Sequence, residues 1–263
     1  MKNNRGKIIF FGNGPLADFA LKKLEQKFEI IYHVRSKADL GTAMQLKKEQ
    51  PEAFGVLASF GVLIPESALK AFEPAGILNI HPSLLPLYRG ASPIESAILA
   101  GDNDFSVSVM KLAKAMDAGP IYWQATLSGL PLRKKAIYQA LAEAGAKWIC
   151  DNLTDLPTAK EQNDKKATFC GKLDKSMSPL NPEKDTANQT LRKIIAYQDY
   201  PKPKYVFYGQ NCIILDAYAL KEGEDAPLKL KCSDGQKLAI TRLQPEGRRA
   251  MDAVSFINGY KNN

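Results

Sequence analysis

An asparagine and a histidine stand two residues apart, at Asn79 and His81, and open a loop rich in proline, glycine and arginine that runs to Gly90. An asparagine amide can donate a hydrogen bond to a developing oxyanion, and an imidazole can move a proton near neutral pH. His81 is one of only two histidines in the chain. Taken alone, such a pair is more often structural, but the composition of the loop favours a functional site.

A third candidate is Asp117, which stands just before Ala118-Gly119. An aspartate in such a context is usually a turn residue. It acquires a chemical role only if the fold brings its carboxylate to His81, where it could orient the imidazole and stabilise its charged form. The sequence therefore predicts a three-residue site only if the fold brings Asp117 close to Asn79 and His81.

A weaker signal is Gly12-Asn13-Gly14, which follows an apolar run and precedes a helical pattern. Backbone amides at a helix N-terminus can hold a phosphate. The full dinucleotide fingerprint is absent, since Ala17 stands where a glycine is needed and no acidic residue ends the next predicted strand. A tight structural turn explains these glycines equally well.

The elements that must position these residues alternate between apolar runs and helical spacing. We expect strands at 7–11, 28–34, 54–59, 77–80, 107–112 and 121–125, and helices at 16–24, 43–49, 92–100 and 134–153. This alternation predicts an α/β fold with a parallel sheet, whose ligands bind beyond the carboxyl ends of the strands. Asn79 and His81 should face the same way if the strand continues through them.

The residue composition changes after about residue 155, where a polar stretch without periodicity is followed by scattered prolines. We expect a short helix at 186–197 and brief strands at 205–208, 212–219, 228–232 and 237–243. Short strands separated by Gly, Asp and Asn turns are typical of a small barrel or sandwich. The chain should therefore consist of an α/β domain to about residue 175 and a small β domain after it.

Composition and charge exclude some classes of protein. The 263 residues carry a net charge of +8 and a pI of about 9.1, which suits a nucleic-acid partner but also an ordinary surface with many solvated lysines. No apolar run reaches eighteen residues, so no membrane span is expected, and the short apolar stretch after the basic N-terminus suits a first strand better than a signal peptide. The four cysteines form no Cys-x-x-Cys pair, so we expect neither a bound metal nor a disulfide framework, in a reducing, cytoplasmic setting.

At this point the residues resemble a known family. Asn79-Ile80-His81 with Ser83-Leu84-Leu85-Pro86 and Tyr88-Arg89-Gly90 is similar to the signature of the folate-dependent formyltransferases, and Asp117 follows at the spacing of that family's third catalytic residue. The resemblance implies 10-formyltetrahydrofolate as the formyl donor. It also implies that Asn79 and His81 stabilise the oxyanion, that His81 relays the proton of the attacking amine, and that Asp117 holds the imidazole in the right tautomer.

The resemblance also implies a folate pocket. The segment from Ala58 to Pro65 is similar to the family segment that walls this pocket. The family's folate contacts correspond here to Phe60, Gly61, Ile64, Ser83, Leu84, Leu85, Pro86, Gly90, Ala118 and Gly119.

Within the family, the chain resembles the methionyl-tRNA formyltransferases. Residues 89–94, the run 172–175 and the C-terminal run 243–251 with Phe256 and Gly259 carry this likeness. It implies a Rossmann-like catalytic domain at 1–175, an OB-like β-barrel at 176–263 that binds tRNA, and a monomer that takes methionyl-tRNA. The tRNA contacts implied are Arg35, Lys37, Lys204, Arg242, Arg248 and Arg249, with Arg192, Lys193 and Lys202 as further basic residues of the second domain.

Two alternatives stay open from the sequence. The first is a formyltransferase that acts on a small amine such as glycinamide ribonucleotide or a sugar nucleotide, because Asn79 to Pro82 also resembles those enzymes. In addition, the stretch between 34 and 51 is shorter than the family's usual tRNA-contacting insertion. The extra β domain argues against the purine-pathway enzymes. The other alternative is an RNA-binding protein on an inactive transferase fold, against which the presence of Asn79, His81 and Asp117 argues.

Overall fold

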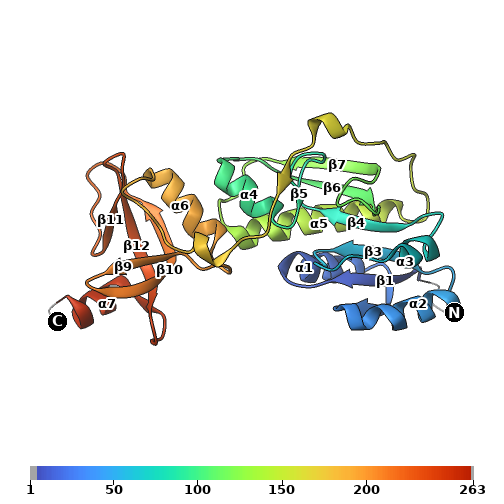
Figure 1. Cartoon of the computed structure of the whole chain (residues 1–263), viewed down its shortest axis with the longest axis horizontal. Coiled ribbons are helices and arrows are strands. Elements are labelled where there is room, and N and C mark those ends of the chain that lie inside the picture. The colour runs from blue at the N-terminus through green and yellow to red at the C-terminus, as the bar shows by residue number, and fades with distance from the viewer. Residues whose placement is uncertain (1–4, 262–263) are drawn as a thin grey trace. The chain divides into compact units, whose positions relative to one another are not determined.

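The computed structural model describes residues 5–261 and divides the chain into two compact units (Figure 1). The first comprises Met1–Ile94 and Asn103–Gly171, and the second comprises Glu95–Asp102 and Lys172–Asn263. Each unit has buried apolar residues of its own. The second unit is discontinuous, because it includes a short stretch from within the sequence of the first.

A six-stranded sheet forms the centre of the first unit, in the order β2-β1-β3-β4-β6-β7. Its strands are β1 (Lys7–Gly12), β2 (Glu29–Val34), β3 (Phe54–Ala58), β4 (Ile77–His81), β6 (Phe105–Lys111) and β7 (Ile121–Leu127). The first four strands of the sheet pair in parallel, whereas β4 with β6 and β6 with β7 are antiparallel. The α/β class is confirmed, and the expectation of an entirely parallel sheet is wrong.

The antiparallel pairing of β6 with β7 follows from a short connection. Only residues 112–120 separate β6 from β7, and a parallel pair of adjacent strands would need a crossover of about a dozen residues or more. The apolar pattern indicates where strands lie but not their direction, so the sequence alone did not distinguish the two arrangements. The connection carries Asp117.

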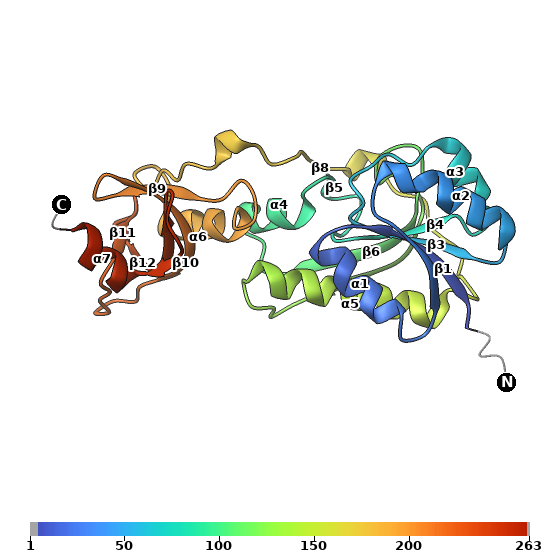
Figure 2. The same ribbon diagram turned by 90° about the horizontal axis from the view of Figure 1, so that it is seen from below.

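Helices cover both faces of this sheet (Figure 2). The helices α1 (Pro15–Leu24) and α5 (Lys134–Asn152) lie on one face, and α2 (Leu40–Glu49) and α3 (Glu66–Ala71) lie on the other. Proline at the start of α1 suits a first helical turn, whose backbone N–H groups have no partner within the helix. The apolar side chains of α1 that point inward are Leu16, Ala17, Ala20 and Leu24.

The irregular segment that follows α5 is not free of structure. Its strand β8 (Phe169–Cys170) pairs in parallel with β5 (Arg89–Gly90). The helix α4 (Pro93–Ala100) follows β5 and crosses the boundary between the units, because the second unit begins at Glu95. Three short 3-10 helices occupy Lys37–Asp39, Asp164–Lys166 and Lys175–Met177.

The second unit contains an antiparallel sheet in the order β11-β12-β10-β9, with β13 beside β12. Its strands are β9 (Lys204–Phe207), β10 (Gln210–Ala219), β11 (Lys229–Lys231), β12 (Lys237–Pro245) and β13 (Met251–Asp252). The helices α6 (Ala187–Ala196) and α7 (Ala253–Tyr260) accompany the sheet, and Phe256 of α7 is fully buried in the core. The β-rich character expected of this part of the chain is confirmed.

Capping side chains mark where the helices of the second unit begin. The Thr186 hydroxyl accepts a hydrogen bond from the backbone N–H of Gln189, and the Gln189 side chain accepts one from the backbone N–H of Thr186, which is a capping box. Asp252 accepts from the backbone N–H of Ser255 and so starts α7. The sequence analysis predicted α6 but neither α7 nor α3.

Candidate active site

Strand β4 positions the first two candidate residues. Ile80 points toward α5, since its side chain lies against Gly145, and the period of two in a strand therefore turns Asn79 and His81 to the opposite face. Each of the two residues is only 4% exposed. The expectation that they face the same way is confirmed.

The loop between β6 and β7 brings Asp117 to this pair. One carboxylate oxygen, Oδ1, lies 3.5 Å from Asn79 Nδ2 and 3.6 Å from His81 Nδ1. The other, Oδ2, accepts a hydrogen bond of 2.9 Å from the backbone N–H of Gly90. The three residues separated in sequence thus meet in the fold, which was the condition set for a functional role of Asp117.

The imidazole of His81 lies between two hydrogen-bond acceptors. Nε2 is 3.1 Å from the carbonyl oxygen of Tyr88, which can only accept, so Nε2 carries a proton and donates it. On the other side of the ring, Nδ1 faces the carboxylate of Asp117. This arrangement fixes the ring orientation and leaves Nδ1 as the atom that can exchange a proton with the aspartate.

A network of buried hydrogen bonds holds the loop that follows β4. The hydroxyl of Ser108 on β6 donates to the carbonyl of Ser83 (2.6 Å) and accepts from the backbone N–H of Leu85 (3.1 Å). Gln124 on β7 donates to the carbonyl of Leu85 (2.8 Å) and to the Ser108 hydroxyl (2.9 Å). Neither Ser108 nor Gln124 is expected from the sequence, because each is one of several polar residues in its strand.

The loop that follows β4 carries several of the residues predicted to contact folate. Ser83 is buried and donates its hydroxyl hydrogen to Leu87, while Leu84 is 39% exposed and Leu85 is buried. Glycine is required at Gly90, because a Cβ there would lie 2.0 Å from the carbonyl oxygen of Cys170. At Gly119 a Cβ would lie 1.9 Å from the carbonyl oxygen of Lys111.

The predicted wall segment after β3 is only partly available to a ligand. The ring of Phe60 is 5% exposed and packs edge-on against Phe11 at a centroid distance of 5.9 Å, so its side chain belongs to the core. Ile64 is half-buried and packs against the same core, and Gly61 is exposed. Leu63, which the sequence analysis did not select, is 77% exposed.

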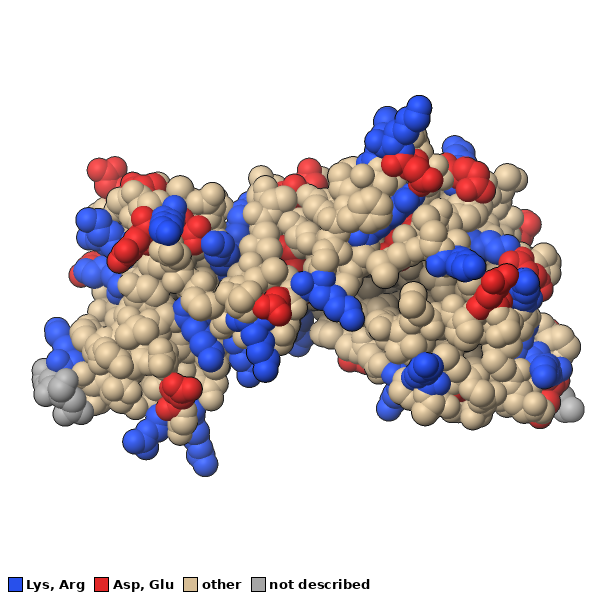
Figure 3. Space-filling model, viewed as in Figure 1, with Lys and Arg blue, Asp and Glu red and all other residues tan. Residues whose placement is uncertain are grey.

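The six predicted tRNA contacts are all exposed. Arg35 and Lys37 belong to the first unit, and Lys204, Arg242, Arg248 and Arg249 belong to the second. Basic side chains on the face in Figure 3 form several small groups interspersed with acidic ones, without one continuous field. Exposure is compatible with phosphate contacts and equally with solvated surface charge.

Arg192 was wrongly included among the basic residues available to tRNA. It is 7% exposed, and its guanidinium donates to the carbonyl oxygens of Ile98 (3.1 Å) and Asp102 (2.9 Å) and to the side chain of Asn188 (2.7 Å). A second residue of that set, Lys193, forms an ion pair of 2.7 Å with Asp185. A predicted amphipathic helix does not reveal which of its cations end in buried hydrogen bonds.

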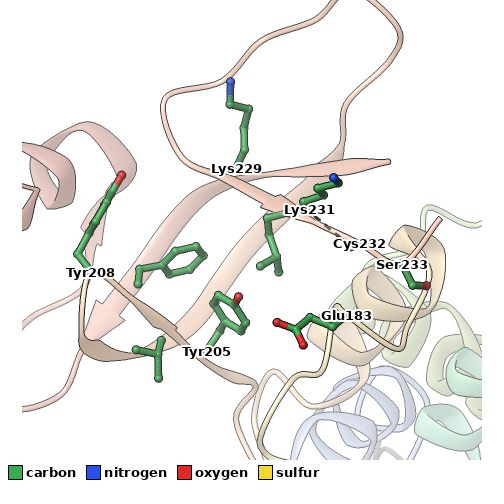
Figure 4. Close-up of a pocket in the computed structure, with 10 residues that line it drawn as sticks. Glu183, Tyr205, Tyr208, Lys229, Lys231, Cys232 and Ser233 are labelled. Atoms are coloured by element: carbon green, nitrogen blue, oxygen red, sulfur yellow. Dashed lines mark hydrogen bonds between the residues drawn. The ribbon is translucent and has the colours of Figure 1, made fainter. Parts of the chain in front are cut away.

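A hollow of about 510 Å³ lies in the second unit (Figure 4). Side chains of β9 and β11 line it, and Figure 4 shows the carboxylate of Glu183 pointing toward Tyr205 while Lys229 extends away. Lys231 and Tyr208 complete its rim. None of Asn79, His81 and Asp117 lines this hollow.

Among residues 5–261, no group of three or more His, Cys, Asp or Glu side chains is placed to hold a metal ion. The same residues include no helix with the length and apolar character that crossing a membrane requires. All four cysteines are free thiols and buried.

The α/β sheet with its buried Asn–His–Asp site, followed by a β-rich unit, identifies the class of protein. The chain belongs to the formyl transferase family: residues 13–153 match the formyl transferase family itself, and residues 172–261 match the formyl transferase C-terminal domain. A methionyl-tRNA formyltransferase of Granulibacter bethesdensis is 32% identical over 220 residues, which cover 78% of this chain and 68% of that protein.

Solved structures share the fold at low sequence identity. A methionyl-tRNA formyltransferase from Clostridium thermocellum aligns with a TM-score of 0.67 at 16% identity, over 94% of this chain and 99% of that one. HypX from Aquifex aeolicus, in complex with tetrahydrofolic acid, aligns with a TM-score of 0.73 at 16% identity. That alignment covers 97% of this chain but only 47% of HypX, so this chain spans about half the length of HypX.

Proposed function

We propose that this protein transfers a formyl group from 10-formyltetrahydrofolate to the amino group of methionyl-tRNA. The observation that carries the proposal is the meeting of Asn79, His81 and Asp117 within 3.6 Å in a chain of the formyl transferase family. The similar protein from Granulibacter bethesdensis bears the name of this activity. The catalytic roles are those that the family resemblance implies, and the distances among the three side chains support them.

The attacking group in this reaction is a neutral amine. As its nitrogen bonds to the formyl carbon, the formyl oxygen gains negative charge and the nitrogen becomes more acidic. Asn79 Nδ2 and a proton on His81 Nδ1 are the donors that we assign to the oxygen. Such preorganised donors typically contribute about 3–4 kcal/mol each to transition-state stability.

The reaction also requires movement of a proton. The amine loses one proton and the folate nitrogen gains one as its bond to the formyl carbon breaks, so no net proton is released. We assign this transfer to His81 and Asp117, because Nδ1 and Oδ1 are 3.6 Å apart and both side chains are nearly buried. The carbonyl of Tyr88 keeps the ring in place throughout.

The folate site that we propose lies along the loop from Ser83 to Gly90. Its support is an exposed apolar edge at Leu84, with Leu87 (37% exposed) nearby, beside the polar site. Ala118 and Gly119 flank Asp117 and would line the same site, and the loop from Gly61 to Ile64 would supply its wall. The buried ring of Phe60 limits that residue to backbone contact.

For the second unit we propose an OB-like barrel that binds tRNA, with residues 1–175 catalytic and 176–263 holding the tRNA. Its support is a five-stranded antiparallel sheet whose outer strands, β9 and β11, flank the hollow with Tyr205, Tyr208 and Lys231. Cations contact phosphates, and aromatic rings can stack on unpaired bases. Arg35 and Lys37 would add contacts from the first unit.

We further propose that the protein acts as a monomer in the cytoplasm and uses no metal. Four thiols that are free and buried support the cytoplasmic setting, while the monomer and the lack of a metal are what the family resemblance implies.

The test uses the full-length purified protein with 10-formyltetrahydrofolate. Formylation of methionyl-tRNA, with no transfer to glycinamide ribonucleotide or to an amino-sugar nucleotide, is the expected result. Transfer to either small amine but not to methionyl-tRNA would assign the chain to another branch of the family. Tight tRNA binding without formyl transfer to any acceptor would instead support the inactive RNA-binding alternative.

A further inference from the structure

The side chain of Gln162 connects the polar segment after α5 to the active site. Its amide nitrogen donates to the carbonyl oxygen of Asp117 (2.8 Å) and to that of Gly119 (2.7 Å). Gln162 lies between the two stretches that match the family, which end at residue 153 and resume at residue 172. All three residues belong to the first unit.

The other end of the amide is held as firmly. The guanidinium of Arg89, a residue only 4% exposed, donates to Gln162 Oε1 through Nε (3.1 Å) and through a terminal nitrogen (2.7 Å). Arginine can only donate and the two carbonyls can only accept, so the orientation of the amide is fixed by its partners. Gln162 thus makes all four hydrogen bonds that an amide side chain can make.

The backbone that Gln162 holds needs such support. Asp117 has φ of 50°, the left-handed region that non-glycine residues adopt at a cost. Its neighbour Met116 is 58% exposed, so little packing restrains that side of the loop. The bonds from Gln162 fall on Asp117 itself and two residues later, and so fix the segment from which the carboxylate projects toward His81.

We propose that Gln162 is a positioning residue for the formyl transfer reaction, which acts by holding the Asp117 backbone so that the carboxylate stays beside His81 and Asn79. The inference rests on the proposed function of the three residues and adds a fourth residue to it. It also assigns a function to residues 154–171, the segment between the two stretches that match the family. Gln162 itself contacts none of Asn79, His81 and the Asp117 carboxylate through a hydrogen bond found in the structure.

The experiment measures steady-state formyl transfer by the full-length protein and two variants. Gln162→Ala removes the whole amide, and Gln162→Glu keeps an acceptor for Arg89 but replaces the donor to the two carbonyls with an oxygen. Both variants should lose kcat by roughly 10- to 100-fold with little change in KM, because displacement of a catalytic group by about 1 Å can cost that much. A role limited to packing around Arg89 predicts instead that Gln162→Glu retains nearly full activity.

The matched control is Asp164→Ala. Asp164 is the other partner of Arg89, at 2.7 Å, but its side chain is 80% exposed and it does not contact the Asp117 loop. This variant should keep kcat within about two-fold, because the Asp164 carboxylate is solvent-exposed and Arg89 keeps both of its hydrogen bonds to Gln162. A loss in Asp164→Ala equal to that in Gln162→Ala would overturn the proposal in favour of a general effect of Arg89.

A second readout follows the imidazole directly. The chain contains only His33 and His81, so protein labelled with ¹⁵N-histidine gives two sets of ring signals. Gln162→Ala and Gln162→Glu should shift the His81 ring signals and leave those of His33 unchanged. Wild-type His81 signals together with wild-type kcat in both variants would overturn the inference. An inactive wild-type protein would refute the proposed function itself, so the two failures are distinguishable.

Discussion

The side chains that we propose for catalysis in the first unit and for tRNA binding in the second differ in how far they are buried. In the first unit Asn79, His81 and Asp117 are largely buried, and each is held by the others or by backbone groups. In the second unit Arg248 and Arg249 are exposed on a turn. The energies of buried, hydrogen-bonded side chains are coupled, whereas exposed cations contribute independently. The effects of substitutions in the two places should therefore differ in both magnitude and additivity.

The largest effect should come from the first unit. Asn79→Ala, His81→Ala and Asp117→Ala should each lower kcat by roughly two to four orders of magnitude, because general acid–base groups and oxyanion donors contribute on that scale. The triple variant should lose far less than the product of the three losses, since residues that act as a unit are not additive. Single-turnover kinetics on folded variants would measure this, and near wild-type turnover in His81→Ala would contradict the assignment.

A buried cation in the second unit tests whether location or burial sets the size of the effect. Arg192→Met removes the hydrogen bonds that the guanidinium donates to the carbonyls of Ile98 and Asp102 and to the side chain of Asn188. Hydrogen bonds to a charged group contribute about 1.5–3 kcal/mol each, so thermal unfolding should show a clear drop in Tm. The salt dependence of tRNA binding should not change, because this guanidinium cannot reach a phosphate.

The exposed pair should behave in the reverse manner. Arg248→Ala with Arg249→Ala should leave Tm and folate binding unchanged, because both side chains are exposed. It should weaken tRNA binding and flatten the slope of log K against log salt by roughly one to two units, as the loss of one or two phosphate contacts requires. Titrations at several salt concentrations measure the slope. An unchanged slope and affinity would remove the pair from the binding surface.

The smallest difference between the units should be in the alkylation rates of their cysteines, which are buried in both. Burial raises the pKa of the thiols of Cys150 in the first unit and of Cys212 and Cys232 in the second. A raised pKa lowers the thiolate fraction at any given pH, so alkylation by iodoacetamide at pH 8 should be slow at all three. Mass spectrometry would reveal the rates, and rapid modification at Cys212 or Cys232 alone would show that the second unit opens more readily.

Much of the site followed from simple periodicities. The strand containing Asn79 and His81 was predictable because apolar residues alternate with them, and a period of two puts the pair on one face. The sequence presents Asp117 only as an aspartate in a turn, and the path of the loop between β6 and β7 shows how it reaches them. Local pattern therefore supplied two of the residues and tertiary structure the third.

Other features carry no local signal. Gln162 lies in a polar stretch without periodicity, and its four bonds join residues far apart in the sequence. The helix α7 was missed because Val254, Phe256 and Ile257 suit a strand as well as a helix, and the cap at Asp252 decides between them. Arg192 has the sequence context of a surface cation and the environment of a core residue.

The discontinuous second unit has a consequence for a chain emerging from the ribosome. Residues Glu95–Asp102 belong to the second unit, where Arg192 of α6 binds the carbonyls of Ile98 and Asp102. That arginine is synthesised roughly 90 residues after Asp102, a delay of roughly 5–20 s at ~5–20 residues per second. During that interval the carbonyls at the end of α4 lack the arginine that binds them. This segment therefore stays accessible to chaperones until α6 has been synthesised.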